Sequence, residues 1–453
     1  MSHDSPRQSL GSDDVERFTK QFEANPAYRL AQNAVTNTSV EDVALDRSVV
    51  TSIATSMSHH LDDWEVTNQK QSGRCWLFAG LNLLRASAAK SMGAKDFEFS
   101  QNYLLFWDKL EKANFWLEAV IETADRDVDD RTVAHLLENP IDDGGQWNMF
   151  VALVAKHGLV PKSAMPETHS SSKTAGMNRS VAQLLRRTAR DLRAAAATGV
   201  SADQLRAKKV ESLEVVHRIL AIHLGAPPST VQWQWQDKDK SFHRDDETTP
   251  QEFAPKYAGL ELTDYICVVH DPRATSEVGR TYTVEHLGNV VDAPPVVYLN
   301  VDISLMRELT MATLVGGEPV WFGCDTGKMA NMERGYWDEH LYDYDGVYDA
   351  KLNMDKADRL LHHDTLMTHA MLFTGVDVVG SDGSETPRRW RVENSWGDEK
   401  ADKGFWTMND NWFGEHVFEI AVRRSALPAE LQQALEQEPI VLPAWDPMGA
   451  LAH

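Results

Sequence analysis

One cysteine stands where a polar loop gives way to an apolar helical pattern. Residues 69–76 read QKQSGRCW, and Cys75 opens the run CWLFAGLNLLRASAAKS, whose apolar residues recur at helical spacing. A thiol in the first turn of a helix faces free backbone N–H groups and the positive end of the helix dipole. This position favours the thiolate, which is the nucleophilic form at neutral pH. The alternative is a buried structural cysteine, the usual fate of an isolated cysteine.

A histidine and an asparagine further along the chain supply what such a nucleophile needs. A thiolate requires an imidazole to hold its proton, and the imidazole requires a group that orients it. His369 lies in the strand-like segment 366–374, and Asn394 follows a second strand-like segment within the sequence ENSWG, 25 residues later. The order cysteine, histidine, asparagine therefore predicts nucleophilic catalysis by a thiol rather than an isolated structural cysteine.

Other catalytic chemistries find little support. His362, His363 and His369 form the one histidine cluster that raises the question of a metal, but their spacing fits no standard zinc template. No G-x-S-x-G, G-x-G-x-x-G or H-E-x-x-H pattern occurs. We therefore expect no metal site.

Composition narrows the class of protein. The 453 residues carry a formal net charge of −23, which opposes general nucleic-acid binding because phosphate recognition depends on clustered Lys and Arg. A hydrophobic fraction of 42% is enough for a large core, and no apolar run reaches the 18 residues of a membrane span. The N-terminus lacks the apolar stretch of a secretory signal, and three cysteines do not form a disulfide framework. These features predict a cytoplasmic protein.

The elements that must position these residues change in type along the chain. Residues 1–60 form a polar lead-in with one helical stretch at 13–23, and helical periodicity follows at 75–91, 101–120 and 146–157. Two further helices occupy 179–225, divided by Thr198-Gly199, with Ser201 as a cap. After about residue 255, strand-like segments dominate, at 265–269, 296–299, 320–322, 367–373, 390–392, 404–408 and 417–422. A helix at 428–437 and an extended apolar tail complete an α+β pattern.

One predicted helix is basic, with Arg186, Arg187, Arg190 and Arg193 close together. A nucleic-acid contact is one interpretation, and a solvated or subunit-facing helix is the other. The acidity of the whole chain favours the second.

The pattern around Cys75 resembles the papain-like cysteine peptidases. In that family a Gln lies six residues before the nucleophile, as Gln69 does here, and Cys-Trp opens the central helix. This chain departs from the family pattern in two ways. Ser72 replaces a cysteine that forms a disulfide in secreted relatives. His369 lies 294 positions after Cys75, so roughly 150 residues more than the usual family spacing lie between them. The stretches NQKQSGRCW, SQNYLLFWDKLEKAN, DGGQW, VWFGCDTGK, LMTHAMLFTGVD, VENSWG and LPAWDPMGALA resemble the bleomycin hydrolase and aminopeptidase C branch.

This resemblance implies a fold and a division of the chain. The expected fold is papain-like and two-lobed, with a helical lobe, an antiparallel β-barrel-like lobe, a helical insertion and an N-terminal extension. The corresponding boundaries are 1–60 for the extension, 61–166 for the helical lobe with the nucleophile, 167–255 for the insertion, 256–425 for the β-rich lobe with His369 and Asn394, and 426–453 for a C-terminal helix and active-site arm.

The resemblance also implies a role for each site residue. Cys75 would attack a peptide carbonyl, His369 would exchange the proton, and Asn394 would orient the imidazole. The Gln69 side chain and the Cys75 backbone N–H would bind the developing oxyanion. Three further positions would contact the substrate or shield the site, with Trp396 covering the His–Asn bond and Gly144 and Gly145 letting an extended peptide approach.

The C-terminal tail is expected to act as an arm in the active-site cleft. By itself, its two prolines and apolar residues indicate an extended segment that packs on the outer surface or frays. Because relatives lay this arm in the cleft, the carboxylate of Ala452 or His453 would meet the substrate's free ammonium group and block longer upstream chains.

Beyond the site, the resemblance implies aminopeptidase action on peptides with a free N-terminus, no metal or cofactor, and a homohexamer. Bleomycin-hydrolase-like amide hydrolysis is a further expectation. The alternatives are an endopeptidase or a catalytically silent peptide-binding protein on the same fold, and a metal-dependent aminopeptidase, which would lose activity in EDTA and resist iodoacetamide.

Overall fold

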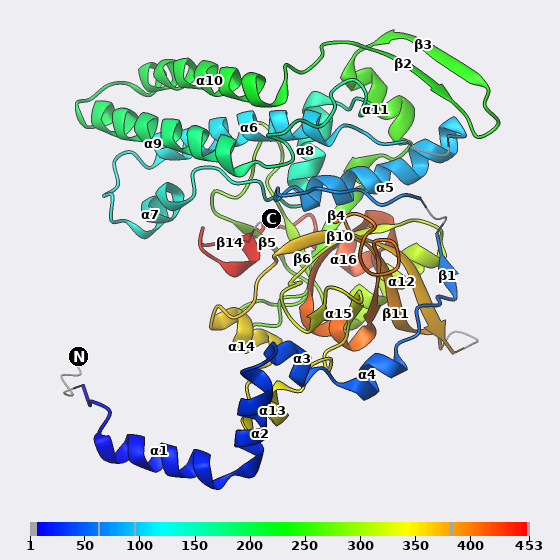
Figure 1. Cartoon of the computed structure of the whole chain (residues 1–453). Coiled ribbons are helices and arrows are strands. Elements are labelled where there is room, and N and C mark those ends of the chain that lie inside the picture. Colours follow the sequence, from blue (N-terminus) through cyan, green and yellow to red (C-terminus); the bar gives the residue numbers. More distant parts are fainter. Residues whose placement is uncertain (1–6, 62–63, 95–96, 381–383, 451–453) are drawn as a thin grey trace.

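The computed structural model describes residues 7–61, 64–94, 97–380 and 384–450. Helices lie above a large sheet in Figure 1, with the segments around α9 and α10 at the top and α1 reaching away from the body at the bottom. This α+β arrangement agrees with the expected papain-like fold. Within the described residues, no helix combines the length and the apolar character that a membrane span requires.

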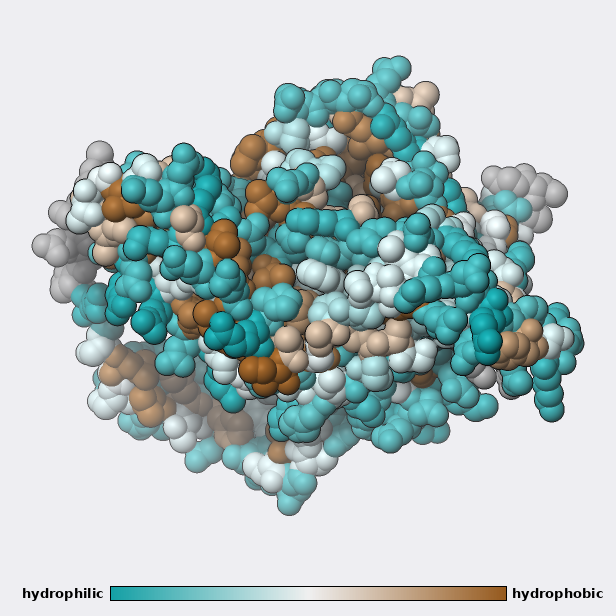
Figure 2. All heavy atoms as spheres, turned by 90° about the horizontal axis from the view of Figure 1, so that it is seen from above, coloured by the Kyte–Doolittle hydropathy of each residue, from teal (hydrophilic) through white to brown (hydrophobic). Residues whose placement is uncertain are grey.

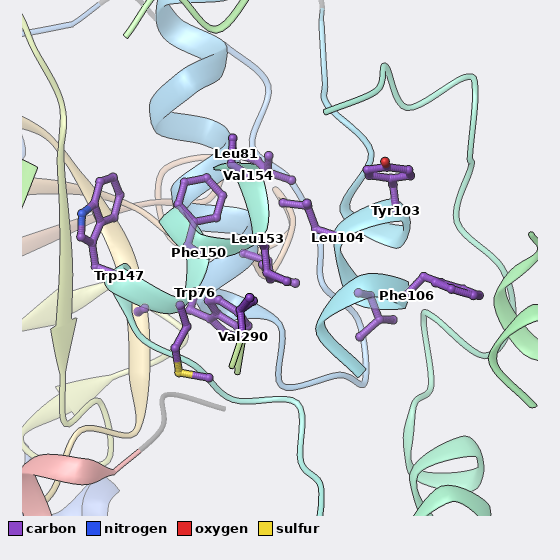
Figure 3. Packing of buried hydrophobic residues seen from close by; sticks show 14 of the residues in the cluster. Trp76, Leu81, Tyr103, Leu104, Phe106, Trp147, Phe150, Leu153, Val154 and Val290 are labelled. Carbon is purple, nitrogen blue, oxygen red and sulfur yellow. The ribbon is translucent and has the colours of Figure 1, made fainter. Parts of the chain in front are cut away.

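The helical lobe is built around one almost completely buried helix. That helix, α5 (Cys75–Met92), packs against α6 (Gln101–Glu122), α8 (Trp147–His157) and α11 (Pro250–Ala258), and α7 (Arg131–Glu138) flanks α6. Figure 3 shows Trp76 and Leu81 of α5 close to Phe150 and Leu153 of α8. A Cβ atom at Gly80 would come within 2.9 Å of the Phe150 ring, so glycine lets the two helices approach. This packing fixes the position of the first turn of α5.

The insertion contains the two expected helices and also a hairpin. Helices α9 (Ala175–Ala197) and α10 (Ala202–Leu224) meet at Thr198-Gly199, and Ser201 forms a capping box with Gln204. The segment expected as a helical insertion also contains a hairpin that was not predicted, in which β2 (Val231–Gln236) and β3 (Phe242–Thr248) form an antiparallel pair. The sequence VQWQWQ alternates with the period of a strand, and Trp233 packs against Phe97 and Phe253. Seen from above, the molecule is mostly hydrophilic, with small scattered hydrophobic groups (Figure 2).

The basic residues of α9 bind the helical lobe. Arg186 donates hydrogen bonds to the carbonyls of Leu137 and Glu138, at the end of α7. Arg193 donates to the carbonyls of Thr123 and Arg126, just beyond α6. Cations at helix C-termini satisfy carbonyls that have no partner within the helix. Arg186 and Arg193 therefore hold α9 against the helical lobe, a role that neither interpretation of the basic cluster included.

The N-terminal segment is more helical than the sequence analysis expected. Besides α1 (Ser12–Ala24) it forms α2 (Pro26–Val35), α3 (Val40–Ala44) and α4 (Arg47–Ser52). The last three are too short for a clear periodicity, but the side chains of Asn25, Ser39 and Asp46 each accept a first-turn backbone N–H. Caps therefore define helices that the apolar pattern does not reveal.

The β-rich lobe contains a twelve-stranded sheet. Its strand order is β14-β5-β6-β4-β13-β7-β10-β11-β12-β9-β8, and β1 pairs with β10. Most pairs are antiparallel, but β4–β6, β5–β14 and β9–β12 are parallel. The strands are β1 (His59–His60), β4 (Tyr265–Val269), β5 (Thr281–Val284), β6 (Tyr298–Asn300), β7 (Val320–Cys324), β8 (Ala330–Asn331), β9 (Tyr336–Trp337), β10 (His369–Val379), β11 (Thr386–Glu393), β12 (Phe405–Asn409), β13 (Val417–Arg423) and β14 (Ile440–Leu442).

Short helices connect these strands. They are α12 (Ile303–Val315), α13 (Tyr344–Tyr348), α14 (Lys356–Leu361), α15 (Asp410–His416) and α16 (Ala429–Ala434). The helix expected over 428–437 is confirmed only as the shorter α16. The extended tail then adds β14 parallel to β5, two strands that the sequence analysis did not identify. The tail thereby runs from the sheet edge toward the helical lobe (Figure 1).

Candidate active site

Cys75 is the first residue of α5, and it is completely buried. Its Sγ accepts a hydrogen bond from the backbone N–H of Ala370 at 3.4 Å. Because Ala370 follows His369 on β10, the start of the central helix meets the start of the strand that carries the histidine. The structure thus brings the cysteine of one lobe to the histidine strand of the other.

His369 and Asn394 form a hydrogen-bonded pair. The Nε2 atom of His369 lies 2.9 Å from Oδ1 of Asn394, the residue after β11. An amide oxygen only accepts, so Nε2 carries the hydrogen and Nδ1 stays free to take up a proton. The Trp396 ring lies 4.7 Å from the His369 ring, centroid to centroid, and covers this buried pair. The histidine therefore has the tautomer that a proton acceptor requires.

Gln69 lies on a loop that pairs with the segment after Asn394. Its backbone N–H donates to the carbonyl of Ser395 at 2.8 Å, and Ser395 Oγ donates to Gln69 Oε1 at 2.5 Å. Gln69 Nε2 donates one hydrogen to the carbonyl of Ser72 at 2.5 Å. An amide nitrogen carries two hydrogens, so one donor remains for another acceptor.

Burial shifts the pKa values of both Cys75 and His369. Burial raises the pKa of Cys75 to about 12, although the N–H groups of Ala370, Trp76 and Cys75 itself act in the opposite direction. Burial likewise lowers the pKa of His369 to about 4, against the effect of the hydrogen bond that His369 donates to Asn394. Desolvation thus opposes the effect of the helix dipole on the Cys75 thiol, and the thiolate nucleophile stays a prediction.

The glycine pair lies directly before α8. A Cβ atom at Gly145 would lie 2.4 Å from the Trp76 ring, so packing alone requires glycine there. The carbonyl of Gly144 accepts a hydrogen bond from the buried Lys112. Contact of Gly144 and Gly145 with a peptide substrate stays a prediction.

The C-terminal arm reaches the residue that follows these glycines. Gln146 Nε2 donates to the carbonyls of Ala450 at 2.8 Å and Met448 at 3.3 Å. The Tyr298 hydroxyl also donates to the Met448 carbonyl, at 3.0 Å. The arm thus lies beside the glycine pair, whereas Ala452 and His453 lie outside the described residues.

A buried ion pair fastens the arm further back. Arg273 donates two hydrogen bonds to Asp446, at 2.9 and 3.0 Å, and it also pairs with Asp271. The Trp445 ring lies 4.0 Å below the Arg131 guanidinium. Sequence reasoning missed Arg273, Tyr298 and Gln146 as arm contacts, because no local pattern marks them. The one available signal is Asp446, an acidic residue in an apolar tail, which indicates a cationic partner elsewhere in the chain.

The remaining candidates lie outside this arrangement. His362 and His363 are exposed at the end of α14, and among the described residues no group of three or more His, Cys, Asp or Glu side chains could hold a metal. Cys267 and Cys324 are buried and unpaired, and burial raises the pKa of both thiols.

Comparison with known proteins gives matches over nearly the whole chain. The family model described as Peptidase C1-like family matches residues 9–449. The chain is 40% identical to aminopeptidase C of Lactobacillus delbrueckii subsp. lactis over 446 residues, covering 98% of both chains. It is 41% identical to human bleomycin hydrolase, covering 98% of this chain and 99% of that protein. The crystal structure of PepW from Lactobacillus rhamnosis HN001 superimposes with a TM-score of 0.95 at 43% identity, covering 98% of this chain and 99% of that chain.

Proposed function

We propose that this chain, which belongs to the Peptidase C1-like family and is a cysteine peptidase, removes residues from the free N-terminal end of peptides. Relatives named aminopeptidase C and bleomycin hydrolase match it along its full length. The observation that carries the proposal is the arm: its backbone is bonded to Gln146, beside the glycine pair and next to the Cys75 helix. An arm in this place leaves room for a chain end rather than for a long upstream peptide.

Catalysis uses Cys75 and His369 as a pair that shares one proton. Cys75 Sγ attacks the scissile carbonyl carbon as its proton passes to Nδ1 of His369, and the imidazolium then gives that proton to the leaving amine. Asn394 keeps Nε2–H engaged throughout, so only Nδ1 exchanges the proton. Water then hydrolyses the thioester with His369 as base, which regenerates the thiol.

The oxyanion is held by the loop that precedes Cys75. The remaining Gln69 Nε2–H and the Cys75 backbone N–H are the donors, and one such donor is worth about 3–4 kcal/mol in comparable sites. Gln69 lies on this loop and Cys75 directly follows it, and the loop is fixed to Ser395 by the pairing described above. The donors therefore keep their position while the carbonyl becomes tetrahedral.

The assignment of Ala452 and His453 to the substrate's ammonium group stays a prediction. It is tested by comparing aminoacyl fluorogenic substrates with N-acetylated versions of the same compounds. We expect the intact enzyme to cleave only the free-amine forms, and the variant without residues 449–453 to cleave the blocked forms as well. A truncated enzyme that still rejects blocked substrates would show that the arm does not set the specificity.

We also propose that copies of the chain associate, as a homohexamer. Helix α1 buries none of its residues, and Phe18 and Phe22 are 48% and 40% exposed. They line an apolar groove of about 1090 Å³ between α1, α2 and α13. Exposed aromatic residues on a protruding helix are typical of a subunit contact. Light scattering should give about 305 kDa, six times the 50.9 kDa of one chain, and Phe18→Ser with Phe22→Ser should lower it.

A cytoplasmic location belongs to the same proposal. Cys75, Cys267 and Cys324 are all unpaired and buried, which suits a reducing compartment. Fractionation of the source cells tests this assignment.

A further inference from the structure

The loop before Cys75 is fastened to the beginning of the insertion. The backbone N–H of Gln71 donates to the carbonyl of Ser172 at 3.0 Å. The Arg74 guanidinium, which is completely buried, donates two hydrogen bonds to Glu167, at 2.8 and 2.9 Å. Ser171 Oγ donates to the same carboxylate at 2.7 Å. Residues 167–178, called here the brace segment, thus contact the residue next to the nucleophile.

A second contact runs through Asp143, which precedes the glycine pair. Its Oδ2 accepts the backbone N–H of Gly73 at 3.0 Å and the Thr174 hydroxyl. Its Oδ1 accepts Asn178 Nδ2 at 2.8 Å and pairs with Lys109 at 2.6 Å. One buried carboxylate therefore links the nucleophile loop, the glycine pair and the brace segment.

The loop itself needs outside support. Lys70 has a φ of 54°, a left-handed conformation that costs a non-glycine residue free energy unless its surroundings impose it. The Ser72 Oγ accepts a hydrogen bond from Arg74 Nε at 2.9 Å. Hydrogen bonds and the Arg74–Glu167 ion pair thus hold the loop in this conformation.

We propose that the brace segment is a positioning element of the active site, and that Glu167, Thr174 and Asn178 are positioning residues for the reaction. Glu167 acts through Arg74, and the other two act through Asp143. Together they hold the loop that carries both proposed oxyanion donors, so the inference rests on the proposed function. The insertion is then part of the catalytic apparatus rather than an addition to the outside of the lobe.

The test compares two brace variants with a matched control. Glu167→Gln removes the charge opposite Arg74, and Asn178→Ala, at a partly exposed position, removes one hydrogen bond to Asp143. The control, Glu118→Gln, removes ion pairs between α6 and Arg206 and Lys209 of α10, which dock the same insertion away from the loop. All three variants loosen the insertion, but only the first two release the loop.

The kinetic readout separates positioning from folding. Because the loop donors act on the transition state, we expect kcat to fall about 10- to 100-fold for Glu167→Gln and about 3- to 10-fold for Asn178→Ala, with KM nearly unchanged. Glu118→Gln should keep the kcat of the parent enzyme. Equal kcat values in all three variants, or a rise in KM alone, would overturn the inference.

Amide hydrogen exchange gives an answer even where a variant loses all activity. The N–H groups of Gln71 and Gly73 should exchange faster in both brace variants and at the parent rate in the control. Unchanged exchange at both amides in Asn178→Ala would contradict the proposal. A parent enzyme without peptidase activity would instead refute the proposed function, while the exchange result would still report whether the brace holds the loop.

Discussion

Weakening the ion pair that fastens the C-terminal arm should relax the restriction to free N-termini. Asp446→Asn keeps one acceptor for Arg273 but removes the charge, and Arg273 keeps Asp271 as a partner at 2.7 Å. Arg273 therefore stays paired in the variant. We expect the substitution to weaken docking of the arm and to leave the free energy of unfolding of the rest of the chain nearly unchanged. A hydrogen bond to a charged group contributes about 1.5–3 kcal/mol.

If Asp446→Asn weakens docking of the arm by about 2 kcal/mol, the fraction of enzyme with an undocked arm rises about 30-fold. The kcat/KM for N-acetylated substrates should rise by the same factor, up to the value of the variant truncated at residue 448, while thermal stability barely changes. Glu436→Gln is the control, because it removes the exposed Arg424–Glu436 pair, which lies just before the arm and contributes little. If truncation opens the enzyme to blocked substrates and Asp446→Asn does not, the ion pair does not hold the arm.

Three further changes test the site itself. Cys75→Ala should abolish hydrolysis and keep the fold, whereas alanine at Cys267 or Cys324 should leave activity measurable; full activity after alkylation of Cys75 would exclude a thiol mechanism. Gln69→Ala should lower kcat about 10²- to 10³-fold with a smaller effect on KM, and an equal loss in binding of a substrate analogue would make it a ground-state contact. Because His369 titrates near 4 in the folded state and near 6.5 unfolded, the unfolded chain binds more protons between these values, so stability falls as pH drops from about 6.5 to 4. This lowering of the His369 pKa corresponds to about 3 kcal/mol of unfolding free energy. Chemical denaturation of His369→Gln between these pH values should therefore show a weaker dependence of stability on pH than the parent enzyme.

The sequence predicted the parts of the site that follow from local chemistry. Cys75 opens a helix whose apolar spacing is plain, and the His369–Asn394 hydrogen bond joins two neighbouring strands that carry strand-like patterns. The hydrogen bond was expected from the resemblance, and the geometry agrees with it. Local pattern and pairing in the sheet point to the same arrangement here.

Contacts between distant segments were not predictable in this way. Arg273 and Asp446 are 173 residues apart, and nothing in the sequence around either residue points to the other. The complete burial of Cys75 was not predictable for the same reason: the helix N-terminus is a local feature, whereas the burial arises only when β10 packs against α5. The hairpin β2–β3 was overlooked because its alternation is brief and lies between two strong helices.

The complete burial of Cys75 bears on how the enzyme withstands oxidants. Peroxide reacts with thiolates that solvent can reach, and it converts them stepwise to sulfenic and then irreversible sulfinic acid. Here none of the surface of Cys75 is accessible, and burial raises the pKa of its thiol. Oxidative inactivation must therefore wait until β10 and α5 separate enough to expose Sγ, so the packing between the two lobes also sets the working lifetime of the enzyme in air.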